Sequence, residues 1–304
     1  MAALRVGATA LVLCLACLEL SSCVVKRRII TRTGAKTSQP QLLNAQVPDL
    51  MRRVADQFDA IHDFSATVDM TPALGTAEKS RITEYKDVRG YILFRKPGDV
   101  RIVGLYPVVR NTAFDMASNG TDFQLYVPSR NRFLVGSNTV DQPSPNKLEN
   151  LRPQHFVDAL LIRPVAPQSK ALLENYTDED NAFYILHTVH IDAGGELVLE
   201  RTIWFSRVDL QLARQIILDP AGNILTDARY SNWKQYGDVK FPSHIEIDRP
   251  HDEYAVVLNV LKIDINRGIS DDKFVLMQPQ GSKLQLVGRA APTTPATSSG
   301  SPGK

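Results

Sequence analysis

Gly90-Tyr-Ile-Leu-Phe-Arg-Lys-Pro-Gly-Asp-Val-Arg-Ile-Val-Gly-Leu105 opens the stretch that decides the fold, and this stretch continues to Gly136. Apolar and polar residues alternate through much of it, a period of two that is typical of strands with one buried face. Turn sequences separate the runs at Pro97-Gly98-Asp99, at Asn119-Gly120 and at Pro128-Ser129-Arg130-Asn131. The stretch therefore predicts a curved antiparallel sheet with one apolar face.

The flanking sequence adds two helices and many more strands. Apolar residues recur at three- and four-residue steps from Val47 to Ile61 and predict a helix over 47–62, and a second helix is predicted near 153–162. Strands are predicted over 64–70 and 82–94, with a loop over 72–79 between them. Residues 168–181 are polar and could be a loop or a short helix, and strands alternate with turns from 183 to 266. The predicted fold class is mainly β (α+β), with about a dozen strands.

The N-terminus predicts export and lipidation. After the basic residue Arg5, an apolar run extends from Val6 to Leu18. This run is shorter than the about 20 residues of a membrane span and is typical of a secretory signal. It ends in Leu20-Ser21-Ser22-Cys23, which resembles the bacterial lipobox. The resemblance implies that Cys23 is acylated and becomes the new N-terminus, and a cysteine without this role is the alternative. Cys14 and Cys17 lie in the segment to be removed, so the mature chain can form no internal disulfide.

The predicted organisation has four parts. They are a lipoprotein signal peptide over 1–22, a lipid-anchored flexible basic linker over 23–41, a folded domain over 42–288 and a disordered tail over 289–304. The net charge is +2, but residues 1–36 hold six positive charges and one negative charge, which leaves −3 for residues 37–304. The basic character therefore belongs to the N-terminal segment, and the charge indicates no nucleic-acid partner.

The sequence contains no pattern that predicts catalysis, a cofactor or a metal site. It has no Gly-x-Ser-x-Gly elbow, no phosphate-binding glycine loop and no His-Glu-x-x-His motif. His187 and His190 are three residues apart in a predicted strand, so their side chains are expected on opposite faces. We therefore predict a protein that is not an enzyme.

Several segments of the central stretch resemble the LolA/LolB superfamily of lipoprotein carriers and outer-membrane receptors. They are Gly90–Pro97, Val100–Ile102, Ser118–Gly120 and Phe123–Pro128. The resemblance extends over residues 42–286 and implies a half-open antiparallel β-barrel, with helices that form a lid over an apolar cavity for acyl chains. The sequence departs from the family at Lys96, where the carriers commonly have arginine, and at Gln124, where they have tryptophan. The loop near 137–150 also makes this chain longer.

The predicted cavity wall consists of the alternating apolar side chains of the central stretch. They are Ile92, Phe94, Val100, Ile102, Phe114, Met116, Phe123 and Leu125. Lys96 falls on the same face as Ile92 and Phe94 and is predicted at the cavity rim, where its charge must reach water or a partner. If these residues line a cavity and not a closed core, an Ile102→Glu variant should fold but lose acyl binding.

The lipobox and the family resemblance together imply a lipid-anchored carrier or receptor on the periplasmic face of the outer membrane. The expected partners are the acyl chains of lipoproteins or lipids, and the membrane through lipidated Cys23. We expect a monomer without a cofactor. The alternative is a sensor or scaffold that uses the same fold to bind a protein partner in the envelope. The residues leave the identity of the cargo open.

Overall fold

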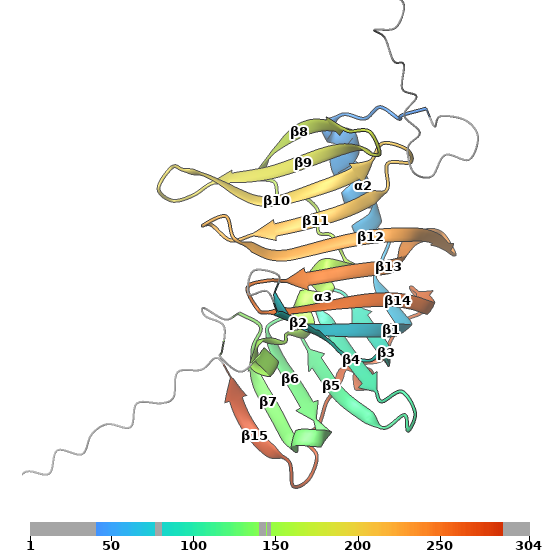
Figure 1. Ribbon diagram of the computed structural model, residues 1–304, viewed down its shortest axis with the longest axis vertical. Helices are drawn as coiled ribbons and strands as arrows, with labels where there is room; N and C mark the ends of the chain where they lie inside the picture. Colours follow the sequence, from blue (N-terminus) through green and yellow to red (C-terminus); the bar gives the residue numbers. More distant parts are fainter. Residues whose placement is uncertain (1–40, 77–80, 140–143, 145–146, 288–304) are drawn as a thin grey trace, which may run out of the picture. The chain divides into compact units, whose positions relative to one another are not determined.

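The computed structural model describes residues 41–76, 81–139, 144 and 147–287 (Figure 1). The chain divides into two compact units, one of Leu42–Tyr176 with Ala182–Lys304 and one of Met1–Gln41 with Thr177–Asn181. In the described part of the second unit, the Asp178 amide donates to the Asn181 carbonyl at 3.0 Å. The predicted signal peptide, Cys23, the linker up to residue 40 and the predicted tail lie outside the described residues.

One open sheet contains the strands of the described chain. Its spatial order is β15-β7-β6-β5-β4-β3-β1-β14-β13-β12-β11-β10-β9-β8, and β2 pairs separately with β1. The strands are β1 (Asp63–Thr76), β2 (Arg81–Glu84), β3 (Val88–Arg95), β4 (Asp99–Leu105), β5 (Thr112–Ser118), β6 (Asp122–Val127), β7 (Arg132–Ser137), β8 (Lys170–Thr177), β9 (Ala182–Ile191), β10 (Leu197–Ser206), β11 (Leu212–Leu218), β12 (Ile224–Tyr236), β13 (Val239–Arg249), β14 (Tyr254–Ile265) and β15 (Lys283–Val287). Neighbours from β1 to β7 and from β9 to β14 pair antiparallel, whereas β15 runs parallel to β7.

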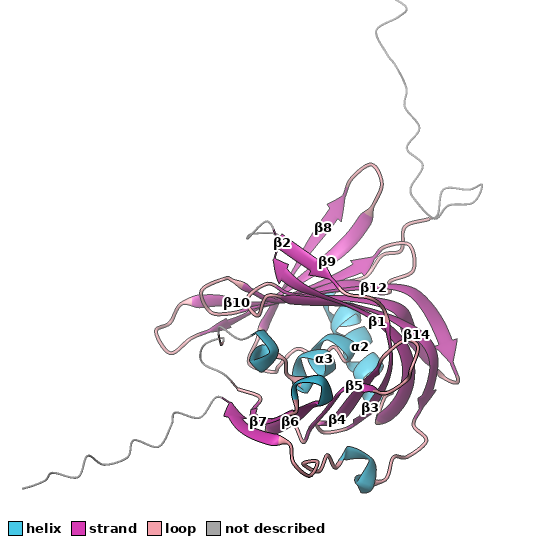
Figure 2. Cartoon of the chain, turned by 60° about the horizontal axis from the view of Figure 1, so that its bottom comes forward, coloured by secondary structure: helices cyan, strands magenta, loops and turns pink. Residues whose placement is uncertain are grey.

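Two α-helices, α2 (Val47–Asp59) and α3 (Pro153–Leu160), lie on the concave side of the sheet (Figure 2). The described residues also form the short 3₁₀ helices η2 (Pro128–Arg130), η3 (Lys147–Asn150) and η4 (Asp271–Phe274). Leu50 and Val54 of α2 are fully buried and join the main core with Phe156 and Ala159 of α3. No helix in the described ranges has the length and apolar character needed to cross a membrane. The predicted mainly β (α+β) architecture, an open curved sheet with helices on its inner side, is confirmed.

Three of the predicted strand and loop segments differ from the structure. The strand β1 continues through Pro72, because Pro72 lies between the pairing of β1 with β3, which ends at Met70, and its pairing with β2, which begins at Ala73. The predicted strand over 82–94 is interrupted at residues 85–87, so that it forms both β2 and β3. The polar segment 168–181 contains the edge strand β8.

The helix α2 ends three residues earlier than predicted because a side chain from β14's end replaces its next turn. Asn266 donates from Nδ2 to the Ala60 carbonyl at 2.8 Å and accepts from the His62 amide at 2.7 Å. These two bonds satisfy backbone groups that a helix terminus leaves without partners. They also join the end of α2 to the start of β1.

Candidate ligand-binding cavity

An apolar cavity of about 490 Å³ opens where β1, β5, β6 and β14 meet the start of α3. This volume lies within the about 300–1,000 Å³ of small-molecule sites. Its lining is Met70, Pro72, Ala73, Leu74, Tyr85, Val88, Tyr106, Ala113, Phe114, Met116, Leu125, Val127, Ser129, Arg130, Leu151, Phe156, Tyr254, Ala255 and Val256. Most of these side chains are aliphatic or aromatic, as expected for a site that takes an apolar ligand.

Strand register brings the buried part of this lining together. Met70 on β1 is opposite Val88 on β3, and Met116 on β5 is opposite Leu125 on β6. Side chains at every second position of a strand share one face, so Val127 follows Leu125 into the cavity. The alternation of apolar and polar residues in the sequence therefore places these apolar side chains on one face of the sheet, where they form the cavity wall.

A pair of glycines makes room for two of the wall side chains. Gly90 on β3 is directly opposite Gly104 on β4. A Cβ atom on Gly90 would lie 2.1 Å from Cε of Met70, and one on Gly104 would lie 2.3 Å from Cε1 of Phe114. The missing side chains thus let Met70 and Phe114 lie across the sheet surface beside the cavity.

The cavity has a polar, exposed mouth and an apolar interior. We define the mouth as Tyr85, Tyr106, Ser129 and Arg130, which line the cavity and are solvent-exposed. The interior residues Met70, Met116, Leu125, Val127, Phe156 and Val256 are buried. Arg130 is the one charged side chain in the lining that the structure describes.

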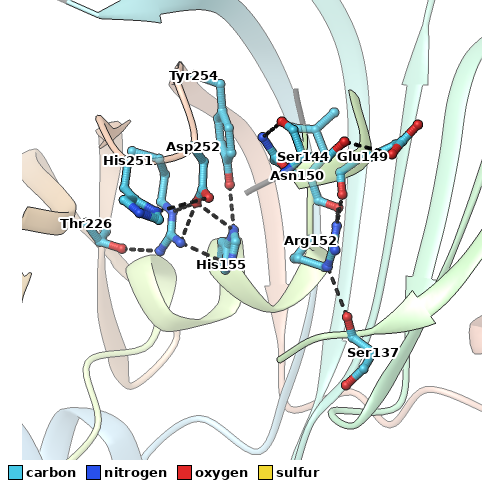
Figure 3. A network of polar contacts seen from close by, with 12 residues as sticks. Ser137, Ser144, Glu149, Asn150, Arg152, His155, Thr226, His251, Asp252 and Tyr254 are labelled. Carbon is cyan, nitrogen blue, oxygen red and sulfur yellow. Dashed lines mark hydrogen bonds and ion pairs between the residues drawn. The ribbon is translucent and has the colours of Figure 1, made fainter. Parts of the chain in front are cut away.

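Behind the cavity, a buried polar network holds the hydroxyl group of Tyr254 (Figure 3). His155 Nδ1 lies 2.8 Å from Tyr254 Oη, and His155 Nε2 lies 3.1 Å from Nη2 of Arg249. A guanidinium group only donates, so Nε2 is the acceptor and the neutral imidazole carries its proton on Nδ1. His155 therefore donates to Tyr254, whose ring forms part of the cavity lining.

Burial and nearby cations keep this network in one charge state. Arg249 also donates to Asp252 Oδ2 at 2.7 Å and to Thr226 Oγ1 at 2.6 Å. Burial, followed by the charges of Arg249 and Arg152, lowers the pKa of His155 well below its usual 6.5. Burial also raises the pKa of the Tyr254 phenol. His155 and Tyr254 are consequently uncharged at neutral pH, whereas Arg249 and Asp252 form an ion pair beside them.

Arg152 anchors the start of α3 beside this network. It is 1 % exposed, it donates from Nε to the Ser137 carbonyl at 3.0 Å, and its Nη1 donates to the carbonyls of Leu151 and Glu149 (Figure 3). Its guanidinium carbon lies 4.2 Å from the centroid of the Phe123 ring. Burial lowers the pKa of Arg152 to about 10. This arginine therefore fixes the position of the helix that supplies Phe156 to the cavity.

The predicted wall coincides with the cavity lining at Phe114, Met116 and Leu125. Ile92, Phe94, Val100 and Ile102 are at most 1 % exposed and belong to the close-packed core. They occupy the same inner face but lie outside the lining, because the two helices and neighbouring strands cover them. Reasoning from the sequence missed Met70, Tyr106, Leu151, Tyr254 and Val256. Met70 and Val256 lie in runs of alternating apolar and polar residues, and this pattern could have predicted them. The other three residues lie at strand or helix ends.

Lys96, predicted at the cavity rim, lies at the other end of β3. Val88, which lines the cavity, is the first residue of β3, and Lys96 follows its last residue, Arg95. The Lys96 Nζ atom donates to the Phe58 carbonyl at 2.7 Å and lies 3.8 Å from the centroid of the Phe58 ring. The sequence left open whether this cation reaches water or a partner, and in the structure it has a partner at the end of α2.

A larger hollow of about 680 Å³ lies between the outer face of β5–β7 and the segment that contains η4. Phe123, which was predicted for the cavity wall, contributes to this hollow. The lining contains charges of both signs, and its Arg95 is already paired with Asp99 and Asp271, each with a contact of 2.6 Å. This hollow is less suited to an acyl chain than the apolar cavity.

The part of the chain that the structure describes contains no cluster of three or more His, Cys, Asp or Glu side chains able to hold a metal ion. His187 Nε2 lies 2.9 Å from Glu174 Oε2, and His190 Nδ1 lies 3.0 Å from Glu200 Oε1. The two histidines therefore have separate carboxylate neighbours.

No protein-family model and no curated protein sequence matches the chain. Among solved structures, a DUF1329 family protein from Desulfovibrio piger matches with 17% identity and a TM-score of 0.51, over 75% of this chain and 95% of that one. A LolA superfamily protein from Nitrosomonas europaea matches with 16% identity and a TM-score of 0.48, over 77% and 99%. A putative outer membrane lipoprotein-sorting protein domain from Vibrio parahaemolyticus matches with 13% identity and a TM-score of 0.48, over 74% and 94%. The chain shares the fold of the Desulfovibrio piger protein, and a LolA superfamily protein is among its structural matches.

Proposed function

We propose that this protein is a non-enzymatic envelope lipoprotein that binds acyl chains of lipids or lipoproteins in the apolar cavity. The observation that carries the proposal is the cavity itself, about 490 Å³ in volume and lined almost entirely by apolar side chains. Each CH₂ group that leaves water contributes about 0.8 kcal/mol, so a chain of about 16 carbons gains on the order of 10 kcal/mol. The names of the LolA superfamily and lipoprotein-sorting matches agree with such a role.

The proposed location is the periplasmic face of the outer membrane, with attachment through acylated Cys23. The support is the sequence Leu20-Ser21-Ser22-Cys23 and the apolar run before it. A Cys23→Ala variant should accumulate as an unprocessed precursor that incorporates no radiolabelled palmitate. Unchanged electrophoretic mobility and labelling in this variant would contradict the proposed anchor, and inner-membrane sedimentation of the wild type would contradict the proposed location.

Blocking the cavity tests the proposed ligand. Val88 lines the cavity and is only half-buried, so a Val88→Trp variant should fold and place its indole in part of the space that the ligand needs. Equilibrium dialysis with radiolabelled dodecanol, below its solubility limit, should show binding to the wild type and a loss of at least about tenfold in the variant. Val103→Trp is the matched control, because Val103 is half-buried on the neighbouring strand β4 but is not part of the lining. Equal binding by all three proteins would show that the cavity is not the site.

One observation favours a protein partner as a second candidate function. The edge strand β15 carries Leu284 and Leu286, which are 55% and 60% exposed, on an edge that pairs on one side only. Exposed edge strands can pair with a strand of another chain. Native mass spectrometry of the protein extracted from membranes separates the two functions, since co-purified lipid supports the first and a stoichiometric polypeptide supports the second.

A further inference from the structure

The charge of the cavity lining is of one sign only. Within the described residues, the lining has one cation, Arg130, and no carboxylate. The remaining polar side chains of the lining are three tyrosines and Ser129. A site for an uncharged acyl chain does not need a cation, so the presence of Arg130 at the mouth requires a separate explanation.

Among the residues that the structure describes, the guanidinium group of Arg130 has no hydrogen-bond or ion-pair partner. The arginines at 89, 95, 101, 214 and 249 each pair with an aspartate. In contrast, Arg130 has neither a hydrogen bond nor an ion pair with any other described residue, and it is solvent-exposed. All five of its N–H donors therefore remain available to a ligand.

The local structure holds Arg130 in place at the end of the cavity wall. Leu125 and Val127 of β6 point into the cavity, and the chain then turns through η2, whose last residue is Arg130. The next residue, Asn131, has a left-handed backbone with φ of 50° and donates from Nδ2 to the Gly281 carbonyl at 3.0 Å. The Asn131 carbonyl accepts from the Lys283 amide at 2.9 Å. Two hydrogen bonds thus hold the end of the turn against residues 281–283, and the arginine lies at the mouth, where an apolar chain would leave the cavity.

The interior offers no competing place for a charged group. Its one polar side chain is Tyr254, which accepts a hydrogen bond from His155 and can offer a ligand a single neutral O–H donor but no cation. Burying a charge among Met70, Met116 and Leu125 would cost several kcal/mol. An amphiphile must therefore bind with its tail inside and its headgroup at the mouth.

We propose that the cavity selects anionic amphiphiles and that Arg130 binds their headgroup, a carboxylate or a phosphate. This proposal rests on the acyl-binding function and adds the chemical class of the ligand. A guanidinium group can bind either headgroup through two parallel hydrogen bonds. A fatty acid and a phospholipid are the two sources of such a headgroup.

Three ligands with the same twelve-carbon tail test the proposal: laurate, dodecyl phosphate and dodecanol. Equilibrium dialysis at pH 8, below the critical micelle concentrations, should show that the wild type binds the two anions about three- to tenfold more tightly than the alcohol. The preference should decrease as the salt concentration rises. Tighter binding of laurate favours a fatty acid as the source, and tighter binding of dodecyl phosphate favours a lipid with a phosphate headgroup.

The variant Arg130→Gln should lose this preference and bind all three ligands with the dodecanol affinity of the wild type. Its fold should persist, because the side chain is exposed and contacts no described partner. Arg267→Gln is the matched control, since Arg267 is also exposed but follows the far end of β14 from the cavity. If wild type binds laurate and dodecanol equally, or if Arg130→Gln keeps the preference, the headgroup proposal is overturned while the acyl-binding function stands. If none of the three ligands binds, both are overturned.

Discussion

The ammonium group of Lys96 donates a hydrogen bond to the carbonyl oxygen of Phe58, and the same group lies over the Phe58 aromatic ring. Phe58 is in the last turn of α2, where carbonyl groups lack intrahelical partners. A cation at this terminus also interacts favourably with the helix dipole. One side chain from the end of β3 therefore joins the helix to the sheet through three interactions.

Replacing Lys96 with methionine should lower the free energy of unfolding by about 1–2 kcal/mol. Methionine keeps the apolar stem but cannot donate a hydrogen bond or carry a charge. Urea denaturation measures the change, and Lys234→Met is the control, because the Lys234 side chain is exposed and forms no hydrogen bond or ion pair with described residues. Equal stabilities of the two variants would show that the contact with Phe58 contributes nothing.

Stability should fall as the pH drops below 6.5, because His155 is buried beside Arg249. In the folded state the pKa of His155 is well below its usual 6.5, so between these two pKa values only the unfolded chain binds the proton. The free energy of unfolding then decreases by up to about 1.4 kcal/mol for each pH unit below 6.5. Urea denaturation at pH 7, 6 and 5 measures this dependence.

The variant His155→Gln should show a weaker pH dependence over the same interval, since glutamine does not titrate. His62→Gln is the control for the loss of a histidine, because the His62 side chain is exposed. A wild-type slope that persists in His155→Gln would assign the pH effect to other groups.

Alternation predicted most of the sheet because it reports which face of each strand is buried. It did not predict the interruption at residues 85–87 or the extension of β1 through Pro72, which depend on the partners of β1. The edge strand β8 was missed for a related reason. Its residues are mostly exposed, so their composition is that of a polar loop even though they form a strand next to β9.

The position of the cavity could not be predicted from alternation alone. Ile92, Ile102 and Met116 are successive neighbours across β3, β4 and β5 on one face, yet only Met116 lines the cavity. These three positions differ in how far other elements of the fold cover them. That cover comes from α2 and α3, whose placement depends on long-range contacts such as those of Lys96 and Arg152.

The parallel pairing of β15 with β7 should be sensitive to a single methyl group. A Cβ atom on Gly136 would lie 2.3 Å from the backbone oxygen of Val287 and 3.0 Å from the Phe123 ring. The backbone of β15 would have to move, so Gly136→Ala should expose the amides of 283–287. Hydrogen exchange should show faster exchange in this segment. Gly195→Ala serves for comparison, since no atom lies within 4 Å of its added Cβ, although its φ of 86° adds backbone strain at that turn. Unchanged exchange in Gly136→Ala would argue against the close contact of β7 with β15.

A buried charge should distinguish the closed core from the cavity. The sequence alone predicted that Ile102→Glu would fold and lose acyl binding. In the structure Ile102 has no exposed surface and is opposite Ile92 and Met116, so its carboxylate would have no access to water. Such burial costs several kcal/mol, and we now expect Ile102→Glu to unfold or to lose its cooperative melt.

Val88→Glu is the matched variant on the adjacent strand β3. Val88 is half-buried and lines the cavity, so a carboxylate there can remain hydrated. This variant should keep the wild-type circular dichroism and a cooperative melt but bind dodecanol at least about tenfold more weakly, because the apolar space now contains a charge and its water. If Ile102→Glu instead melts like the wild type and loses only ligand binding, the ligand must reach Ile102. The acyl site would then extend along β4 into the region that is closed core in the structure.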